Sequence, residues 1–183
     1  MKRSKIGFGV IGAGGIGFDV SEFLVSGGHS TTLDTEAWLR EWGVADPAVA
    51  RGGLGKPEIT PPARQVYLLQ RKAAPLGKGL GKTTGWIHRA QLKMKRVEMI
   101  GGVNYERIDA RGLHVSFGER HEKPTLLEVD TIVLCAGQEP QRALAEPLQA
   151  KGAKVHLIGG ADVAAELDAK RAIEQGTRLA ASL

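Results

Sequence analysis

The sequence predicts an α/β fold, namely a Rossmann-like, three-layer nucleotide-binding domain with a mostly parallel sheet and a β-hairpin excursion. Three observations predict it. An apolar run at 6–11 leads directly into the glycine-rich stretch GAGGIG, further apolar runs occupy 65–70 and 129–137, and YERIDARGLHVSF between them is typical of a hairpin. Strand, helix and strand in this order, then a hairpin and a return to apolar strands, indicate an open sheet with helices on both faces.

The first strand, 6–11, ends at a G-x-G-x-x-G motif that opens a helix with apolar positions at Phe18, Phe23 and Leu24. The first glycine of such a motif allows a sharp turn, the second leaves room for a pyrophosphate, and the third lets helix and sheet pack closely. Free amides at the helix start and the helix dipole favour an anion. The alternative is a glycine-rich turn without a ligand. We predict a dinucleotide site formed by Gly12, Ala13, Gly14, Gly15, Ile16 and Gly17.

The polar stretch 26–64 is expected to be a surface insertion. Within it, DTEAWLREWGV predicts a short helix that is capped at Asp34 or Thr35. Trp38, Leu39 and Trp42 would share one face of that helix.

The second strand, 65–70, is followed by Arg71 and Lys72. NAD-binding domains carry an acidic residue at the end of this strand, whereas NADP requires a cation for its 2′-phosphate. We therefore predict NADPH as the ligand, the alternative being two cations that merely face solvent. Lys82 is a candidate second phosphate contact. Its segment, GKGLGKTTGW, is not a nucleoside triphosphate loop, because Leu76 stands where that motif needs glycine.

The remaining elements follow from apolar patterning. We expect a helix at 86–95, a short strand and turn at 97–103 and a hairpin at 105–117 that turns near 110–112. A buried strand at 129–137, another strand at 154–160 and a final helix at 163–181 should follow.

Composition excludes several classes of function. The net charge of +5 and the pI near 9.5 come from dispersed cations with few aromatic residues, which gives no stacking platform for nucleic acid. Cys135 is the single cysteine, so we expect a small core residue and no disulfide or cysteine metal site. His88 and His114 lack companion ligands at metal spacing, and His156 is expected to be half-buried in a strand. No segment reads as a signal peptide or membrane span, which predicts a cytoplasmic protein.

Four phrases together resemble the C-terminal portion of bacterial NADPH-dependent 2,4-dienoyl-CoA reductases, from about Val10 to the end of the chain. They are VIGAGGIGFDVSEFL, LLQRKAAPLGKGLGKTTGWIHR, VDTIVLCAGQEPQRAL and VHLIGGADVAAELDAKRAIEQGTRLA. The resemblance implies a modular flavoenzyme of fatty-acid β-oxidation, in which NADPH and FAD domains pass electrons through an iron–sulfur cluster to FMN in a TIM barrel. It implies that FMN and the cluster belong to the parent enzyme and not to this chain.

The resemblance also assigns residues. Ala136 and Gly137 match a small-residue turn that passes the cofactor, although a plain strand-to-loop turn is the alternative. Gly160 and Asp162 resemble a late FAD motif in which the carboxylate binds the ribityl chain, and Asp162 could instead cap the final helix. Without an earlier FAD loop, only a partial FAD site is implied.

The resemblance divides the chain into an NAD(P)H-binding domain at 5–137 and a segment at 138–183 that returns to the FAD domain. We expect an electron-input module whose partners are NADPH, the FAD domain and the FMN barrel, and which is inactive alone. Because the chain starts almost on the first strand, we interpret its start as a truncation or an alternative start. The alternative function is a non-catalytic NADP(H)-binding module or sensor.

Overall fold

The computed structural model describes residues 6–28, 30–165 and 169–183. The chain divides into two compact units, Met1–Ala136 and Gly137–Leu183.

A parallel four-stranded sheet forms the middle layer of the first unit. Its strand order is β3-β2-β1-β7, and every pairing in it is parallel. Val10 of β1 lies opposite Leu68 of β2 on one side and Val133 of β7 on the other. The strands are β1 (Gly7–Ile11), β2 (Gln65–Leu69), β3 (Glu98–Ile100) and β7 (Thr131–Leu134).

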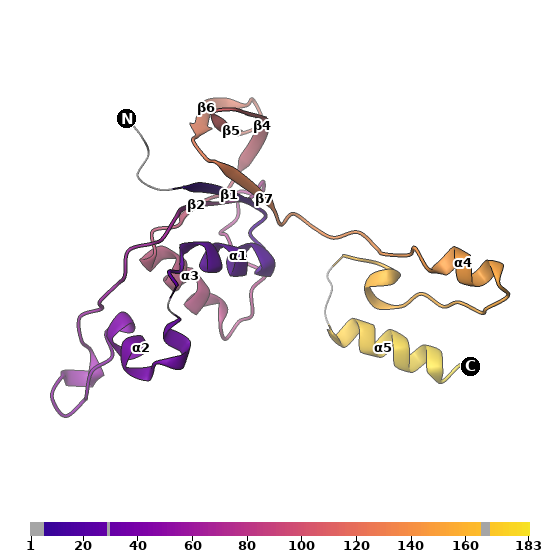
Figure 1. Cartoon of the computed structure of the whole chain (residues 1–183), viewed down its shortest axis with the longest axis horizontal. Coiled ribbons are helices and arrows are strands. Elements are labelled where there is room, and N and C mark those ends of the chain that lie inside the picture. The colour runs from indigo at the N-terminus through magenta and orange to yellow at the C-terminus, as the bar shows by residue number, and fades with distance from the viewer. Residues whose placement is uncertain (1–5, 29, 166–168) are drawn as a thin grey trace. The chain divides into compact units, whose positions relative to one another are not determined.

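Two helices cover one face of this sheet, α1 (Gly15–Val25) and α3 (Gly85–Met94) (Figure 1). Phe18 of α1 and Leu92 of α3 pack against Val10 and Leu68 in one hydrophobic cluster, and each of the four is no more than 1% exposed. This burial fixes the start of α1 over the end of β1.

A three-stranded antiparallel sheet covers the opposite face (Figure 1), with the order β4-β5-β6. Its strands are β4 (Val103–Asp109), β5 (Gly112–Phe117) and β6 (Glu122–Leu127). Val103, Leu113 and Val115 pack there against Ile11 and Leu69. The predicted α/β fold, the parallel sheet and the hairpin are confirmed. The prediction that helices cover both faces of the sheet was wrong. Apolar patterning shows that both faces of a strand are buried and does not show whether a helix or a sheet covers them.

The segment that follows α1 holds a 3₁₀ turn at Thr31–Leu33, α2 (Thr35–Trp42) and a second 3₁₀ turn at Arg51–Gly53. Asp34 caps α2 as predicted, because its Oδ1 accepts a hydrogen bond from the Ala37 amide at 2.9 Å. The rings of Trp38 and Trp42 lie 6.0 Å apart on one helix face.

The second unit holds α4 (Ala145–Ala150), a 3₁₀ turn at Gly159–Ala161 and α5 (Ala169–Ala180). The strand predicted at 154–160 does not form, because that segment has no hydrogen-bonded neighbour strand. The final helix begins at Ala169 in the described residues rather than at Val163, and 166–168 lie outside them. His156 is exposed and lies outside any strand, contrary to prediction.

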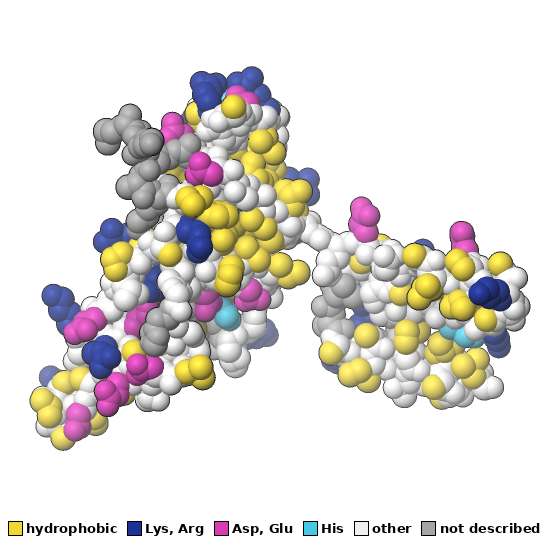
Figure 2. Space-filling view, viewed as in Figure 1, with side chains coloured by type: hydrophobic (Ala, Val, Ile, Leu, Met, Phe, Trp, Pro, Cys, Tyr) yellow, Lys and Arg dark blue, Asp and Glu magenta, His cyan; other side chains and the backbone are white. Residues whose placement is uncertain are grey.

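Several predicted core positions are exposed. Leu134 of β7 is 74% exposed and Phe23 of α1 is 75% exposed. The β7 strand was predicted to be buried, but it lies at the edge of its sheet and pairs with β1 alone. Hydrophobic side chains also spread over the visible face of the 137–183 unit (Figure 2). No helix in the described part of the chain is both long and apolar enough to cross a membrane.

Candidate functional site

The four parallel strands bring their carboxyl ends to one edge of the sheet. The strand order reverses at β1, which lies between β2 and β7. In open α/β sheets, ligands bind beyond the carboxyl ends of the strands at such a reversal. The Gly12 amide donates to Leu69 O at 2.8 Å, and the Cys135 amide donates to Ile11 O at 2.7 Å. The glycine-rich turn is thereby held between the ends of β2 and β7.

The three motif glycines meet three different environments. A Cβ on Gly12 would lie 2.3 Å from Cys135 O, and Gly12 has a φ of +112°. A Cβ on Gly17 would lie 1.8 Å from Gly12 O, whereas a Cβ on Gly14 would meet no atom within 4 Å. Gly12 and Gly17 are therefore required by the fold, and the space beside Gly14 is open to a ligand. A pyrophosphate fits this cradle, since it needs the backbone to be uncovered where it approaches.

The start of α1 is suited to an anion. Gly14 is the N-cap of α1, no side chain caps the helix, and its first turn carries no acidic residue. The amides of the first turn have no carbonyl partner within an α-helix and carry the positive end of its dipole. Gly14, Gly15 and Ile16 are exposed, so this end of the helix faces solvent.

Arg71 and Lys72 lie immediately beyond β2, at the same edge as the glycine turn. Both are exposed, and neither has an ion-pair partner in the described part of the chain. They follow Leu69 closely in the sequence, and the Leu69 carbonyl oxygen accepts the hydrogen bond from the Gly12 amide. The two cations thus follow directly from the strand that is bonded to the glycine turn.

Arg71 interacts electrostatically with Tyr105, a residue of β4 in the antiparallel sheet. Burial raises the pKa of Tyr105, and the Arg71 guanidinium acts in the opposite direction on the same pKa. The Tyr105 hydroxyl is buried and has no hydrogen-bond partner among the described residues. Sequence reasoning missed this phenol. Its alternation with Val103 could have identified it as inward-facing, but its proximity to Arg71 depends on non-local packing.

Lys82 lies on the long loop between β2 and α3 and is exposed. The loop is fastened at Gly77, whose carbonyl accepts a hydrogen bond from Arg89 Nη1 at 3.1 Å. A Cβ on Gly77 would lie 2.7 Å from the Phe18 ring. The loop is thus anchored on α3 through Arg89 and packs on α1 at Phe18, but among the described residues no hydrogen bond links Lys82 with Arg71 or Lys72.

At the end of β7, Ala136 lies beside the glycine turn. Its Cα would be 3.0 Å from a Cβ on Gly12. Gly137 follows with a φ of +144°, a conformation that favours glycine. Burial raises the pKa of the Cys135 thiol, so this cysteine is not an activated nucleophile.

Gly160 and Asp162 lie in the second unit, in and just after the 3₁₀ turn at Gly159–Ala161. Asp162 Oδ2 accepts a hydrogen bond from Gln175 Nε2 at 3.1 Å, and Gln175 Oε1 accepts one from the Gly159 amide at 2.7 Å. Asp162 is therefore tied to α5 through Gln175. It does not cap that helix, which begins at Ala169 in the described residues.

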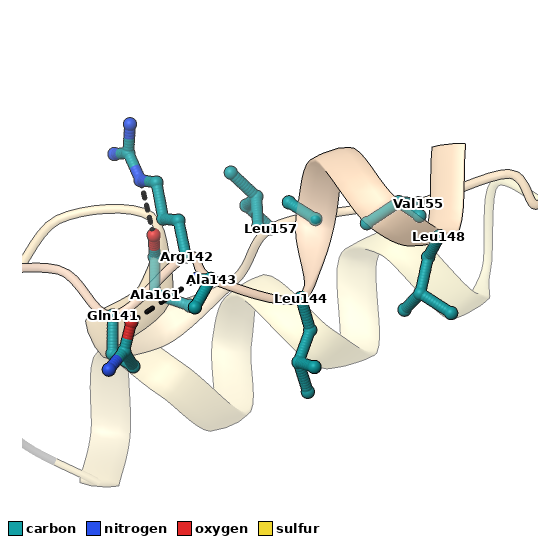
Figure 3. Close-up of a pocket in the computed structure, with 9 residues that line it drawn as sticks. Gln141, Arg142, Ala143, Leu144, Leu148, Val155, Leu157 and Ala161 are labelled. Carbon is teal, nitrogen blue, oxygen red and sulfur yellow. Dashed lines mark hydrogen bonds between the residues drawn. The ribbon is translucent and has the colours of Figure 1, made fainter. Parts of the chain in front are cut away.

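A pocket of about 460 Å³ opens in the second unit (Figure 3). Arg142 Nε donates to Ala161 O at 2.7 Å at one end of it, and the leucines at 144, 148 and 157 line the remainder. Most of the lining side chains are apolar. Leu144 is 74% exposed, so the pocket is open to solvent.

Three histidines have carboxylate partners that sequence reasoning did not find, and the shortest of these contacts joins His121 Nδ1 to Glu106 Oε1 at 2.6 Å. His114 Nε2 lies 2.8 Å from Asp109 Oδ2, and His88 Nδ1 lies 3.5 Å from Glu22 Oε2. In the residues described, no group of three or more potential metal-ligating side chains occurs, and the prediction that His88 and His114 are not metal ligands stays a prediction.

Comparison with solved structures places the fold. A 2-naphthoyl-CoA reductase in complex with 2-naphthoyl-CoA is similar, with a TM-score of 0.63 at 17% identity over 98% of this chain and 21% of that one. An NAD-dependent persulfide reductase from A. fulgidus has a TM-score of 0.44 at 17% identity over 85% of this chain and 21% of that one. An engineered water-forming NADPH oxidase bound to NADPH gives 0.41 at 17% identity, over 81% and 24%. The chain therefore spans between 21% and 24% of these proteins.

The comparison with protein families covers nearly the whole chain. Residues 2–171 match the family described as pyridine nucleotide-disulphide oxidoreductase. The matched range includes the glycine turn, the cations beyond β2 and the 3₁₀ turn of the second unit. The chain belongs to the pyridine nucleotide-disulphide oxidoreductase family.

Proposed function

We propose that this chain is the NADPH-binding, electron-input module of a flavin-dependent reductase of the 2,4-dienoyl-CoA reductase type. One observation carries the proposal, namely the open glycine cradle at Gly14 together with two cations that follow the strand bonded to that cradle and have no ion-pair partner among the described residues. In this proposal the first-turn amides of α1 hold the pyrophosphate, and Arg71 and Lys72 hold the 2′-phosphate. Bound NADPH supplies a hydride and FAD accepts it.

The residues of this chain then bind and orient, and they carry no acid–base step. Hydride transfer between nicotinamide and flavin is the cofactors' own chemistry, to which a protein adds position and electrostatics. Ala136 and Gly137 would leave the cofactor room to pass the end of β7. Lys82 would supply a second phosphate contact from the loop anchored at Gly77.

For the second unit we propose that 138–183 belongs to the FAD-binding part of the parent enzyme, with Gly160 and Asp162 in a partial FAD site. In support, α5 has no buried residue, and Ile173 on it is 66% exposed. The acyl-CoA substrate, FMN and the iron–sulfur cluster would be handled by other domains of that enzyme.

The test is a titration of the chain with NADPH and with NADH, followed by tryptophan fluorescence or calorimetry. We expect NADPH to bind at least about tenfold more tightly than NADH, because the 2′-phosphate adds charge-assisted hydrogen bonds. The double variant Arg71→Glu/Lys72→Glu should lose about 100-fold or more in NADPH affinity and keep its affinity for NADH within about twofold.

A matched control makes the same change of charge elsewhere. Arg51 and Lys56 are exposed cations on the segment between α1 and β2, so Arg51→Glu/Lys56→Glu alters the net charge equally. We expect it to retain the preference for NADPH. Absence of pyridine nucleotide binding, or equal losses in the two double variants, would contradict the proposal.

A further inference from the structure

The turn that carries the two cations is bonded to the start of β4. The Val103 amide donates to Gln70 O, and the Gly102 amide donates to Lys72 O, each at 3.1 Å. The Gln70 amide in turn donates to Ile100 O at 3.1 Å. The main chain on both sides of Arg71 is thereby fixed to the segment that joins β3 to β4.

The side chain of Gln70 closes the same turn from within. Its Nε2 donates to Lys72 O at 2.9 Å and to Ala74 O at 2.5 Å. A primary amide has two hydrogens to donate, and this geometry uses both of them. Lys72 O therefore accepts from two donors, the Gln70 side chain and the Gly102 amide.

The backbone of Gly101 and Gly102 lies close to this turn. A Cβ on Gly101 would lie 3.2 Å from Lys72 O and 3.4 Å from Ala74 O. A Cβ on Gly102 would lie 3.6 Å from the Ala73 Cβ. The turn at 71–74 is thus enclosed by Gln70 on one side and by the two glycines on the other.

We propose that Gln70 is a positioning residue that determines nucleotide specificity, because it holds the turn in which Arg71 and Lys72 meet the 2′-phosphate. This inference rests on the proposed function. Two long cationic side chains lose conformational freedom when they bind a phosphate, and a fixed backbone reduces that cost. The hydrogen bonds of Gln70 engage the carbonyl oxygens of the turn, so those oxygens do not compete with the phosphate for the cations.

The amide has a role that a carboxylate of the same shape could not fill. Glu at position 70 would bring a negative charge to the end of β2, face two carbonyl oxygens with no donor, and repel a phosphate. An acidic residue at the end of this strand is the arrangement that suits the ribose hydroxyl of NAD. Gln70 thus fixes the turn without adding the charge that would oppose NADPH.

The experiment compares three variants of the full chain. Gln70→Leu removes both side-chain hydrogen bonds at similar volume, and Gln70→Glu keeps the shape and adds a charge. The control is Gln65→Leu, because Gln65 begins the same strand at the opposite edge, is half-buried, and donates one side-chain hydrogen bond, to Tyr67 Oη at 2.6 Å. The dissociation constants for NADPH and for NADH and the midpoint of thermal unfolding are measured for each.

We expect Gln70→Leu to weaken NADPH binding about tenfold, as two cationic side chains lose their ordered backbone, and to change NADH binding less than about twofold. Gln70→Glu should weaken NADPH binding further, and Gln65→Leu should leave the ratio of the two constants unchanged. If Gln70→Leu does not fold, Gln70→Glu decides the question by the same ratio.

Two results would overturn the inference. Unchanged dissociation constants for both nucleotides in the folded Gln70 variants would show that the turn does not need the hydrogen bonds of the Gln70 side chain. An equal loss for both nucleotides shows a general structural role and no effect on specificity. Either result differs from failure of the proposed function, in which the unaltered chain itself would show no preference for NADPH.

Discussion

Replacing Gly17 and Gly14 separately by alanine should divide the glycine turn into a structural part and a binding part. A Cβ on Gly17 would lie 1.8 Å from Gly12 O and 3.0 Å from Gly12 C. Both atoms are backbone at the end of β1, so no side-chain rotation relieves the contact and α1 must move away from the sheet. Phe18, which is 1% exposed in the hydrophobic cluster, would move with it.

This movement should destabilise the protein as much as overpacking does at other core positions. We therefore expect Gly17→Ala to lower the free energy of unfolding by about 3 kcal/mol. For a domain of this size, that corresponds to a fall of about 6–12 °C in the melting temperature. Gly14→Ala meets no atom within 4 Å. It should cost less than about 1 kcal/mol, the difference between glycine and alanine at an N-cap.

For NADPH binding, Gly14→Ala should have the larger effect of the two substitutions. Gly14→Ala places a methyl group where the pyrophosphate approaches, so NADPH affinity should fall at least about tenfold while the fold is retained. Circular dichroism melting and NADPH titration on the same two proteins give both quantities. A Gly17→Ala protein that melts with the unaltered chain, or a Gly14→Ala protein with full NADPH affinity, would refute the assignment.

Two further predictions concern charged groups outside the glycine turn. Lys95 Nζ contacts the Glu41 carboxylate, whose side chain is 13% exposed, so Lys95→Met should cost about 3 kcal/mol in urea unfolding by leaving a buried charge unpaired. The double variant Lys95→Met/Glu41→Leu should recover most of that loss. If the single and the double variant lose the same unfolding free energy, the two side chains are not a coupled pair. The Arg111 amide, and then the His114 side chain, hold the pKa of Asp109 below its ordinary value of 3.8. Stability from the Asp109 carboxylate is therefore complete above that value and is lost as the pH falls through the lower, folded-state pKa. The difference in unfolding free energy between the unaltered chain and Asp109→Asn should shrink below about pH 4, and a difference independent of pH would contradict this assignment.

The glycine turn and the strands around it were predictable because their causes are local. A positive φ at Gly12 and a helix that must approach β1 at Gly17 both require glycine, whatever the rest of the chain does. The apolar run at 65–70 likewise contains β2, because two buried faces need apolar residues at successive positions.

Other features depend on contacts between distant segments. The third antiparallel strand, β6, has the sequence EKPTLL, in which the first four residues are exposed, so no apolar alternation marked it. The hydrogen bonds between the turn at Gln70 and the start of β4 join residues at least 30 positions apart. No pattern within either segment specifies that pairing. The cation pair could therefore be read from the sequence, whereas the means of holding it in place could not.

The second unit shows a different reason for failed predictions. The segment 154–160 has the apolar content of a strand, yet it pairs with no strand, and Leu157 and Ile158 on it remain 38% and 40% exposed. On α5, Ile173 is likewise exposed, although the small residues Gly159 and Ala172 bring the 3₁₀ turn against the helix. Apolar side chains at strand and helix spacing are stabilising only where a neighbour covers them, at about 25 cal/mol for each Å² removed from water. The sequence of this unit thus encodes burial that its described residues do not provide, and this supports the proposal that 138–183 belongs to the FAD-binding part of the parent enzyme.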